Sequence, residues 1–380
     1  MTVATALVSG NDPLPQLAEQ AVSEALEKAG LTHANGVLLF LTPDFARHAQ
    51  HTVTAVARAA KCTQVAGGIA AGVFTESGWV LDRPAAAVML FGRGLSIGHP
   101  ELSGTLREPV LSYTGSAFPN DWSEAGARFG GSFTGTVGYA DPVAWQQSRL
   151  AEQQRCSVQL LNAHTSIGVS SGLQLLCEPQ RIEASSGYDL ELLGGQSALR
   201  CLSRVLPAEY REQPQLPLHH LTAVLIDNEY CHSTEDAQVA LAVGRYHPIA
   251  IIAVNADNSL TLAERTNIGQ KLAWAVRRPV SAEADMRQTL ARLSADTPDP
   301  ACALMFSCIG RGPYFYGGED RDLDIMRNRF PGLPLLGVYG TGQIAPTASG
   351  DRQINRQLQN AVVTALISKR QKDSNVQSIA

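Results

Sequence analysis

A strand–helix–strand pattern whose second strand is rich in glycine occurs twice in this chain of 380 residues. The first copy has an apolar strand at residues 36–41 and a glycine-rich strand at residues 65–74, and the second copy has them at residues 302–308 and 335–344. Glycine weakens a strand unless another group must approach its backbone closely, so its recurrence is unusual. The repetition predicts an α/β protein with two related domains. Each would be a mixed β-sheet packed by helices, and the two would be related by approximate internal duplication.

Chain length and proline content suggest where the domains divide. A chain of this length usually forms two or three domains. The proline-rich residues 207–219 predict a linker between an N-terminal domain, residues 1–206, and a C-terminal domain, residues 220–368. A last helix is predicted to begin at Asp351, because apolar residues recur at helical spacing after it. Residues 369–380 are expected to form a flexible tail.

Composition excludes several classes of partner. The net charge of −5 does not attract nucleic acid or an anionic membrane. The longest apolar stretches, residues 85–91 and 249–254, are far too short to span a bilayer, and no signal peptide is evident. The seven cysteines are odd in number, widely spaced and free of CxxC pairs. This argues against a disulfide framework or a thiolate zinc site and favours reduced thiols in the cytoplasm.

The densest group of chemically capable residues follows the apolar strand of the second copy. Cys308 ends that strand, and Arg311 stands between Gly310 and Gly312. Turns that contain glycine can present several backbone N–H groups to an anion, and a guanidinium beside them can clamp a carboxylate or phosphate. We expect these four residues to line a ligand site at the C-terminal end of the strand.

Two other interpretations of this turn stay open. Arg311 could pair with a local acid, such as Glu319 or Asp320, and only fix the loop. Cys308 could be a nucleophile whose pKa Arg311 lowers. No histidine or asparagine near Cys308 in the sequence signals the base that such chemistry requires.

A second group of candidate residues lies in the glycine-rich strand at 335–344. Gly337, Tyr339, Thr341 and Gln343 alternate along it, so they share one face of the strand. The glycines here match neither a P-loop nor a dinucleotide-binding fingerprint. We expect these residues to line the ligand site, and the alternative is a solvated face of the sheet.

Two of the nine histidines are placed to bind haem or a metal. His164 follows an apolar strand, and His247 precedes one. Neutral imidazole is the usual donor to haem iron. No histidine spacing matches a metal-binding motif, so no structural metal is expected.

The repeated segments resemble a known family. Residues 37–45 and 65–72 resemble the N-terminal FIST domain, residues 303–312 and 334–346 resemble the C-terminal FIST domain, and residues 182–187 and 192–199 resemble the stretch between them. The resemblance implies a sensory module that binds small ligands such as amino acids. Some bacterial members are similar to haem-binding nitric oxide sensors that act on a histidine kinase. The family usually has Glu where this chain has Gln343, and residues 110–150 match its pattern poorly.

These observations favour a small-ligand-binding sensory protein that does not turn its ligand over. The expected ligand is amino-acid-like or anionic, and the expected partner is a separate signalling protein such as a histidine kinase. The alternatives are a haem-binding nitric oxide sensor, an enzyme that uses Cys308, and a protein–protein adaptor.

Overall fold

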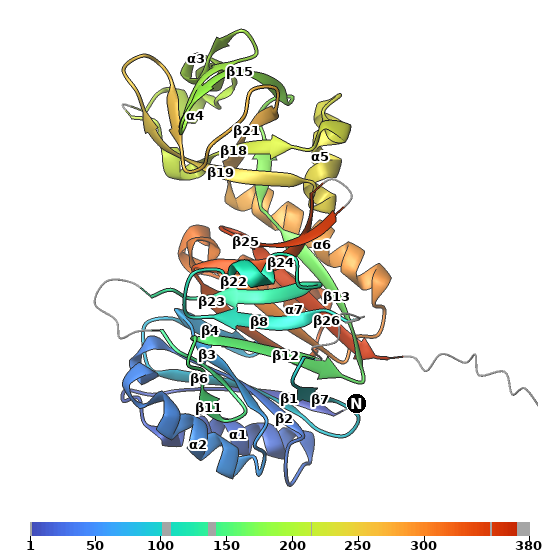
Figure 1. The fold of residues 1–380 in the computed structure, drawn as a ribbon. Coiled ribbons are helices and arrows are strands. Elements are labelled where there is room, and N and C mark those ends of the chain that lie inside the picture. The colour runs from blue at the N-terminus through green and yellow to red at the C-terminus, as the bar shows by residue number, and fades with distance from the viewer. Residues whose placement is uncertain (1, 101–107, 136–141, 214, 350–351, 371–380) are drawn as a thin grey trace, which may run out of the picture. The chain divides into compact units, whose positions relative to one another are not determined.

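The structure is a computed structural model that describes residues 2–100, 108–135, 142–213, 215–349 and 352–370. The chain forms two compact units (Figure 1). Unit 1 consists of residues 1–169, 288–346 and 354–380, and unit 2 of residues 170–287 and 347–353. Unit 2 is therefore an insertion into the sequence of unit 1. Among the described residues, no helix is both long and apolar enough to cross a membrane.

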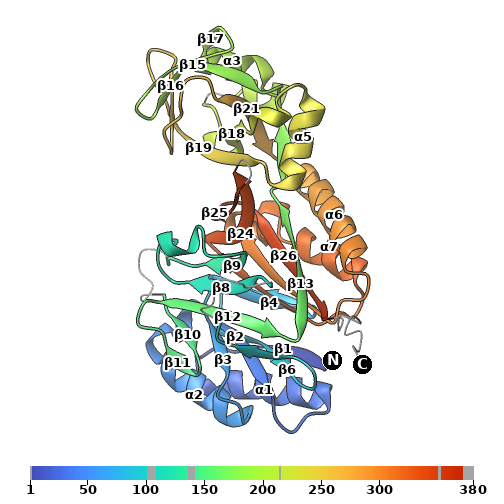
Figure 2. The same cartoon turned by 45° about the vertical axis from the view of Figure 1, so that its right-hand side comes forward.

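Sheet I of unit 1 contains the first copy of the repeated motif. Its strand order is β1-β6-β2-β3-β10-β11. The strands are β1 (Val3–Ser9), β6 (Ala85–Phe91), β2 (Gly36–Leu41), β3 (Val65–Ile69), β10 (Ala144–Gln146) and β11 (Arg149–Leu150). Strands β2 and β3 are parallel, and the 3-10 helix η1 (Pro43–His48) and helix α2 (Ala49–Ala59) connect them. Helix α1 (Pro15–Ala29) and α2 lie side by side against one face of this sheet (Figures 1 and 2). Both faces of β2 and β6 are buried.

Sheet III of unit 1 contains the second copy. Its strand order is β13-β26-β22-β23-β4-β5. The strands are β13 (Ala163–Ser170), β26 (Val362–Lys369), β22 (Cys302–Cys308), β23 (Leu335–Gly340), β4 (Gly72–Thr75) and β5 (Gly78–Val80). Helix α6 (Pro279–Asp296) precedes β22. Strands β22 and β23 are parallel, and helix α7 (Arg321–Arg329) lies between them in the sequence.

The two copies have the same connectivity. In each, a parallel strand pair is flanked by an antiparallel strand on either side: β6 and β10 in sheet I, β26 and β4 in sheet III. The predicted α/β class with mixed sheets is confirmed. Both copies lie within unit 1, however, because β4 follows β3 along the chain but pairs with β23 of the second copy.

Sheet II of unit 1 has two faces of different character. Its strand order is β25-β24-β9-β8-β12-β7. The strands are β25 (Arg352–Leu358), β24 (Gly342–Ser349), β9 (Arg128–Ser132), β8 (Val110–Thr114), β12 (Arg155–Leu161) and β7 (Ser96–Gly98). Because alternate residues face opposite sides, Tyr113, Gly131 and Gln343 lie on the face toward the hydrophobic core, and Ser112 and Arg128 lie on the other.

Unit 2 is built around an antiparallel sheet that closes on itself. Its strand order is β14-β21-β15-β16-β20-β19-β18, and β18 pairs back with β21. The strands are β14 (Leu173–Leu175), β21 (Lys271–Arg277), β15 (Gln180–Ser186), β16 (Asp189–Leu193), β20 (Leu260–Leu262), β19 (Tyr246–Val254) and β18 (Leu221–Ile226), with β17 (Gln196–Ser197) beside β16. Helices α3 (Ala198–Val205), α4 (Ala208–Arg211) and α5 (Thr234–Val243) complete the unit, whose core contains the fully buried Trp274.

The expected linker is part of unit 2. The units change at residues 169/170 and 287/288 rather than at 207–219. Tyr210 and Leu218, which lie in the proline-rich segment, pack with the hydrophobic core of unit 2. Pro207 and Pro217 each precede a short helix within a packed unit, and the expected division into residues 1–206 and 220–368 does not coincide with the boundaries of the compact units.

The predicted last helix is wrong. Residues 352–369 form the antiparallel strands β25 and β26. The apolar run in β26 lies between β13 and β22 and is buried on both faces, and such a run satisfies helical and strand spacing equally. Asp351, its expected cap, lies outside the described residues, as do residues 371–380 of the expected tail and residues 136–141 of the poorly matching segment.

We predict that Gly337→Ala destabilises the protein by about 1–3 kcal/mol through overpacking. A Cβ at this position would lie 2.0 Å from Cε2 of the buried Phe74 ring on the neighbouring strand β4. Gly78→Ala on β5 is the control, because no atom lies within 4 Å of its Cβ position. Urea denaturation should show less than about 0.5 kcal/mol of change in the control. Equal stability of the two variants would contradict this role of Gly337.

Candidate functional site

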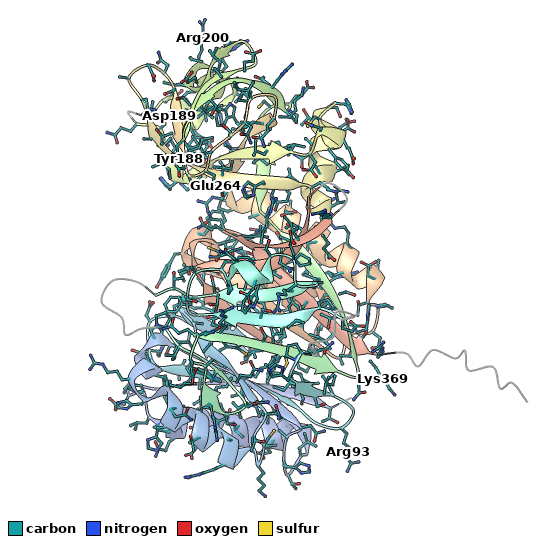
Figure 3. The ribbon with its side chains drawn as sticks, viewed as in Figure 1. Arg93, Tyr188, Asp189, Arg200, Glu264 and Lys369 are labelled. Atoms are coloured by element: carbon teal, nitrogen blue, oxygen red, sulfur yellow. The ribbon has the colours of Figure 1, made fainter. Side chains whose placement is uncertain are left out.

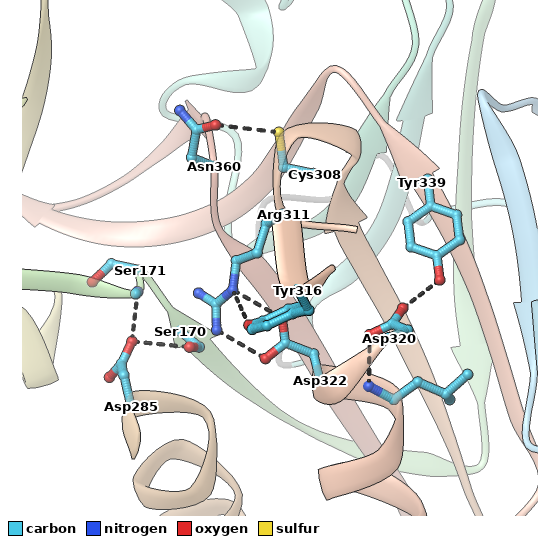
Figure 4. Close-up of polar contacts among 12 residues, drawn as sticks. Ser170, Ser171, Asp285, Cys308, Arg311, Tyr316, Asp320, Asp322, Tyr339 and Asn360 are labelled. Atoms are coloured by element: carbon cyan, nitrogen blue, oxygen red, sulfur yellow. Dashed lines mark hydrogen bonds and ion pairs between the residues drawn. The ribbon is translucent and has the colours of Figure 1, made fainter. Parts of the chain in front are cut away.

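Strand β22 ends at Cys308, and the chain turns through the 3-10 helix η5 (Ile309–Arg311). The Cys308 Sγ lies 3.9 Å from Asn360 Oδ1, in the turn between β25 and β26 (Figure 4). A Cβ on Gly310 would lie 2.9 Å from the same oxygen, and one on Gly312 would lie 3.3 Å from the ring of Tyr339. These glycines therefore let the turn pack against its neighbours. The thiol contacts an amide oxygen, which is not a base that would activate it.

Arg311 forms a buried ion pair. Its Nε donates to Asp322 Oδ2 at 2.9 Å and its Nη2 to Asp322 Oδ1 at 3.0 Å, and neither side chain is more than 2% exposed. The hydroxyl of Tyr316 also donates to Asp322 Oδ2, at 2.9 Å (Figure 4). Burial acts to lower the pKa of Arg311, but the charge of Asp322 raises it above its usual value. The interpretation of Arg311 as part of a structural pair is confirmed, with Asp322 as the partner rather than Glu319 or Asp320.

Tyr339 is also engaged by the protein. Its hydroxyl donates to Asp320, whose other carboxylate oxygen accepts a hydrogen bond from Leu323 N at 2.9 Å and so caps α7 (Figure 4). The Tyr339 ring packs on Phe74 with centroids 4.8 Å apart. Burial raises the pKa of Asp320 to about 6. The expected contact of Tyr339 with a ligand is thus replaced by this hydrogen bond.

Thr341 likewise has partners within unit 1. Its Oγ1 accepts a hydrogen bond from Thr134 N at 3.2 Å and lies 3.5 Å from Ser132 O. Gly337, as noted above, accommodates Phe74. The glycines of β23 predict that some group approaches the strand closely. In the structure, side chains and backbone of the protein make this approach.

Gln343 differs from the other candidates. Its side chain is fully buried, and neither Oε1 nor Nε2 has a hydrogen-bond partner among the residues that the structure describes. Buried polar groups are nearly always paired, and leaving one unpaired costs about 1–3 kcal/mol. Of the eight residues predicted to bind a ligand, Gln343 is the one whose buried side-chain amide has no hydrogen-bond partner among the described residues.

Aromatic rings and a glycine lie on the same side of the sheet as Gln343. Gly131 is its partner across β9, and a Cβ on Gly131 would lie 3.0 Å from Phe306 and 3.5 Å from Tyr113. The Phe306 ring in turn contacts Phe129 and Phe40, with centroids 6.4 Å and 6.3 Å apart. None of Phe129, Gly131 and Phe306 was among the residues predicted from the sequence to bind a ligand. The alternation of Phe129 and Gly131 was the available signal.

Both histidines proposed as haem ligands lie beside acids. His164 is 54% exposed, and its Nδ1 lies 3.2 Å from Glu108. The Nε2 of His247 is 2.8 Å from Glu264, which Figure 3 labels. An axial haem ligand presents a free ring nitrogen to a buried apolar site. Each histidine directs one ring nitrogen to an acid instead, and the two lie in different units. The other ring nitrogen of His247, Nδ1, is buried and has no hydrogen-bond partner among the described residues. Within the described ranges, no three His, Cys, Asp or Glu residues gather where a metal could bind.

Part of the chain matches a known domain family. Residues 198–346 match the family model described as the FIST C domain, so this part of the chain resembles FIST C domains. The match includes β22, β23 and Gln343, and it continues across residues of both compact units. The N-terminal FIST domain expected in residues 1–206 stays a prediction.

Mycobacterial proteins are similar to this chain. An uncharacterised protein of Mycobacterium tuberculosis is 26% identical over 196 residues, which cover 50% of this chain and 49% of the relative. An uncharacterised protein of Mycobacterium bovis is 26% identical over 182 residues, which cover 47% and 45% respectively. The chain thus spans about half the length of the curated relatives it matches.

We predict that breaking the buried ion pair is costly. Arg311→Met leaves the charge of Asp322 buried and should lower the unfolding free energy by about 3–5 kcal/mol. Asp322→Asn should lower it by a smaller amount. Arg321→Met is the control, because its pair with Glu319 is exposed and should contribute less than about 1 kcal/mol. Chemical denaturation measures all three. A fully stable Arg311→Met protein would show that the pair does not hold this turn.

We also predict a pH dependence due to Asp320. Since the folded chain raises this pKa from 3.8 to about 6, Asp320 adds stability in its protonated state, up to about 3 kcal/mol. This contribution is complete below about pH 4 and is lost as the pH rises through about 6. Asp320→Asn keeps the helix cap but cannot titrate. The stability of the wild type relative to this variant should therefore fall between pH 4 and 7, and a constant difference would contradict the prediction.

Proposed function

We propose that the protein is a small-ligand-binding sensory protein whose ligand bonds to Gln343 in unit 1. The observation that supports this most directly is the fully buried amide without a partner among the described residues. The match of residues 198–346 to the FIST C domain, whose family is generally sensory, agrees with such a role.

The surroundings of Gln343 indicate the kind of group it would bind. An amide offers two N–H donors and an acceptor oxygen, so it pairs best with a group that both donates and accepts. The neighbouring Phe306 and Tyr113 rings are apolar, and the Tyr113 hydroxyl already donates to Ile69 O at 2.7 Å. A charged group would pay a large desolvation penalty beside these rings. The ligand group at Gln343 is therefore neutral, such as an amide or a protonated acid.

The other candidate residues support binding without turnover. Arg311, Tyr339 and Asp320 satisfy one another or their neighbours, and Cys308 contacts an amide. A ligand held by Gln343 would then act by changing the stability of the sheets around it and so alter a surface that a signalling partner, such as a histidine kinase, recognises.

The test replaces the amide with an apolar side chain of similar size, Gln343→Met. If the amide is unpaired in the free protein, this variant should be as stable as the wild type or more stable, by about 1–3 kcal/mol, because no buried polar group is left. Native mass spectrometry of the two proteins, purified identically, should find a small molecule bound to the wild type and absent from the variant.

Asn355→Leu is the matched control. Asn355 is also a buried amide, but its Nδ2 donates to Trp122 O at 2.7 Å and to Gly126 O at 2.6 Å, and its Oδ1 accepts from Arg128 N at 2.8 Å. This variant should lose several kcal/mol, about 1–3 for each backbone group left unpaired. A comparable loss in Gln343→Met would show that Gln343 is bonded within the protein, and the proposal would fail.

A further inference from the structure

Arg128 is a second arginine in a buried position, on the opposite face of sheet II from Gln343. It begins β9 and is 9% exposed. Its Nη1 donates to the hydroxyls of Ser112 at 2.9 Å and Ser157 at 3.1 Å. Its guanidinium carbon lies 4.9 Å from the centre of the Trp122 ring, which is itself buried. One corner of the guanidinium is thus held by two serines and one face by an indole.

No carboxylate of the described residues forms an ion pair with Arg128. The nearby Asp121 is taken by Arg155, whose Nη1 donates to both of its oxygens at 2.8 Å and 3.0 Å. The Nε of Arg128 is buried and has no hydrogen-bond partner in the described part of the chain. Buried charges in proteins are otherwise paired, because an isolated one is costly to remove from water.

Comparison with Arg311 shows what is missing. Arg311 uses its Nε and Nη2, the two donors on one edge of the guanidinium, to hold both oxygens of Asp322. This fork matches the spacing of carboxylate oxygens. In Arg128 the same edge carries the unpaired Nε, whereas the serines occupy Nη1. In Arg311 this edge binds a carboxylate. In Arg128, no carboxylate of the described residues meets the same edge.

Other hydrogen bonds hold the segments around Arg128 in place, and the Nε–Nη2 edge of its guanidinium takes no part in them. Asn355 binds the backbone of Arg128, Trp122 and Gly126 together, so the segment that carries Trp122 is fastened to β9. Burial lowers the pKa of Arg128, with Asp121 opposing that effect. Such a rigid donor loses little freedom when an anion arrives, which favours binding.

We propose that Arg128 is an anion-binding residue that holds the carboxylate of a small molecule through its Nε and Nη2, beside Trp122. A carboxylate fits better than a phosphate dianion, because the site offers one net positive charge: Arg155 is neutralised by Asp121. The site is independent of the proposed function at Gln343, since the two side chains lie on opposite faces of sheet II. It also accounts for an anionic ligand, which the apolar surroundings of Gln343 do not.

Acetate is the probe for this site. Saturation-transfer NMR on the full chain, with acetate titrated against chloride at constant ionic strength, should show saturable binding of acetate. Arg128→Met should abolish it, and Arg128→Lys, which keeps the charge but loses the fork, should weaken it about tenfold or more. Arg149→Met is the charge-matched control, because Arg149 is exposed on β11, and it should bind acetate as the wild type does.

Thermal denaturation without acetate distinguishes an anion-binding role of Arg128 from a purely structural role. An unpaired buried cation replaced by methionine should leave the melting temperature unchanged or higher. A lower melting temperature in Arg128→Met, or wild-type acetate binding in Arg128→Lys and Arg128→Met, would overturn the proposal. So would the absence of saturable acetate binding to the wild type. Gln343→Met should bind acetate normally, so failure at one site is distinguishable from failure at the other.

Discussion

The three sheets of unit 1 meet at the ring of Phe306. This side chain of sheet III contacts Phe40 of sheet I and Phe129 of sheet II. The ring packs against sheet II because Gly131 carries no side chain, and Gly131 is the register partner of Gln343 on the neighbouring strand. Close packing of large rings against glycine positions is what allows three sheets to share one core. The same packing encloses Gln343 without a hydrogen-bond partner among the residues that the structure describes.

The two buried arginines show how the same chemistry serves different purposes. Arg311 and Asp322 neutralise each other in a bidentate pair, so together they fasten the turn after β22 to helix α7. Arg128 has hydroxyls and an indole around it instead of an acid. In a buried ion pair the two charges already neutralise each other. A buried cation without an acid is less stable, so binding of an anion can lower its free energy. Recognition is therefore more plausible at Arg128 than at Arg311.

Local sequence patterns predicted the elements around the candidate site well. The apolar strand at 302–308 and the helix that follows it are present as β22 and α7. The expected strand at 335–344 is instead divided into β23 and β24, which belong to different sheets, so Tyr339 and Gln343 do not share one strand face. The failures came where a pattern suits two structures. The apolar residues of β26 satisfied helical spacing, and the prolines near Tyr210 suggested a linker although the segment packs into a core. Arg311 was identified as a clamp, but its partner, Asp322, is a residue of the same chain.

The sequence by itself determined the α/β class, the repeated strand–helix–strand motif and the resemblance to FIST domains, because these depend on the order of apolar residues and glycines along short segments. Only the tertiary structure decided which polar groups are satisfied. Arg311 and Tyr339 find their partners, Asp322 and Asp320, and Gln343 is enclosed without one among the described residues, because of how the strands and helices pack in the fold. Hydrogen bonds form only within a narrow range of distances. No spacing along the sequence encodes those distances. Arg128 therefore emerged as a buried cation with no paired acid among the described residues only once β8, β9 and β12 were side by side.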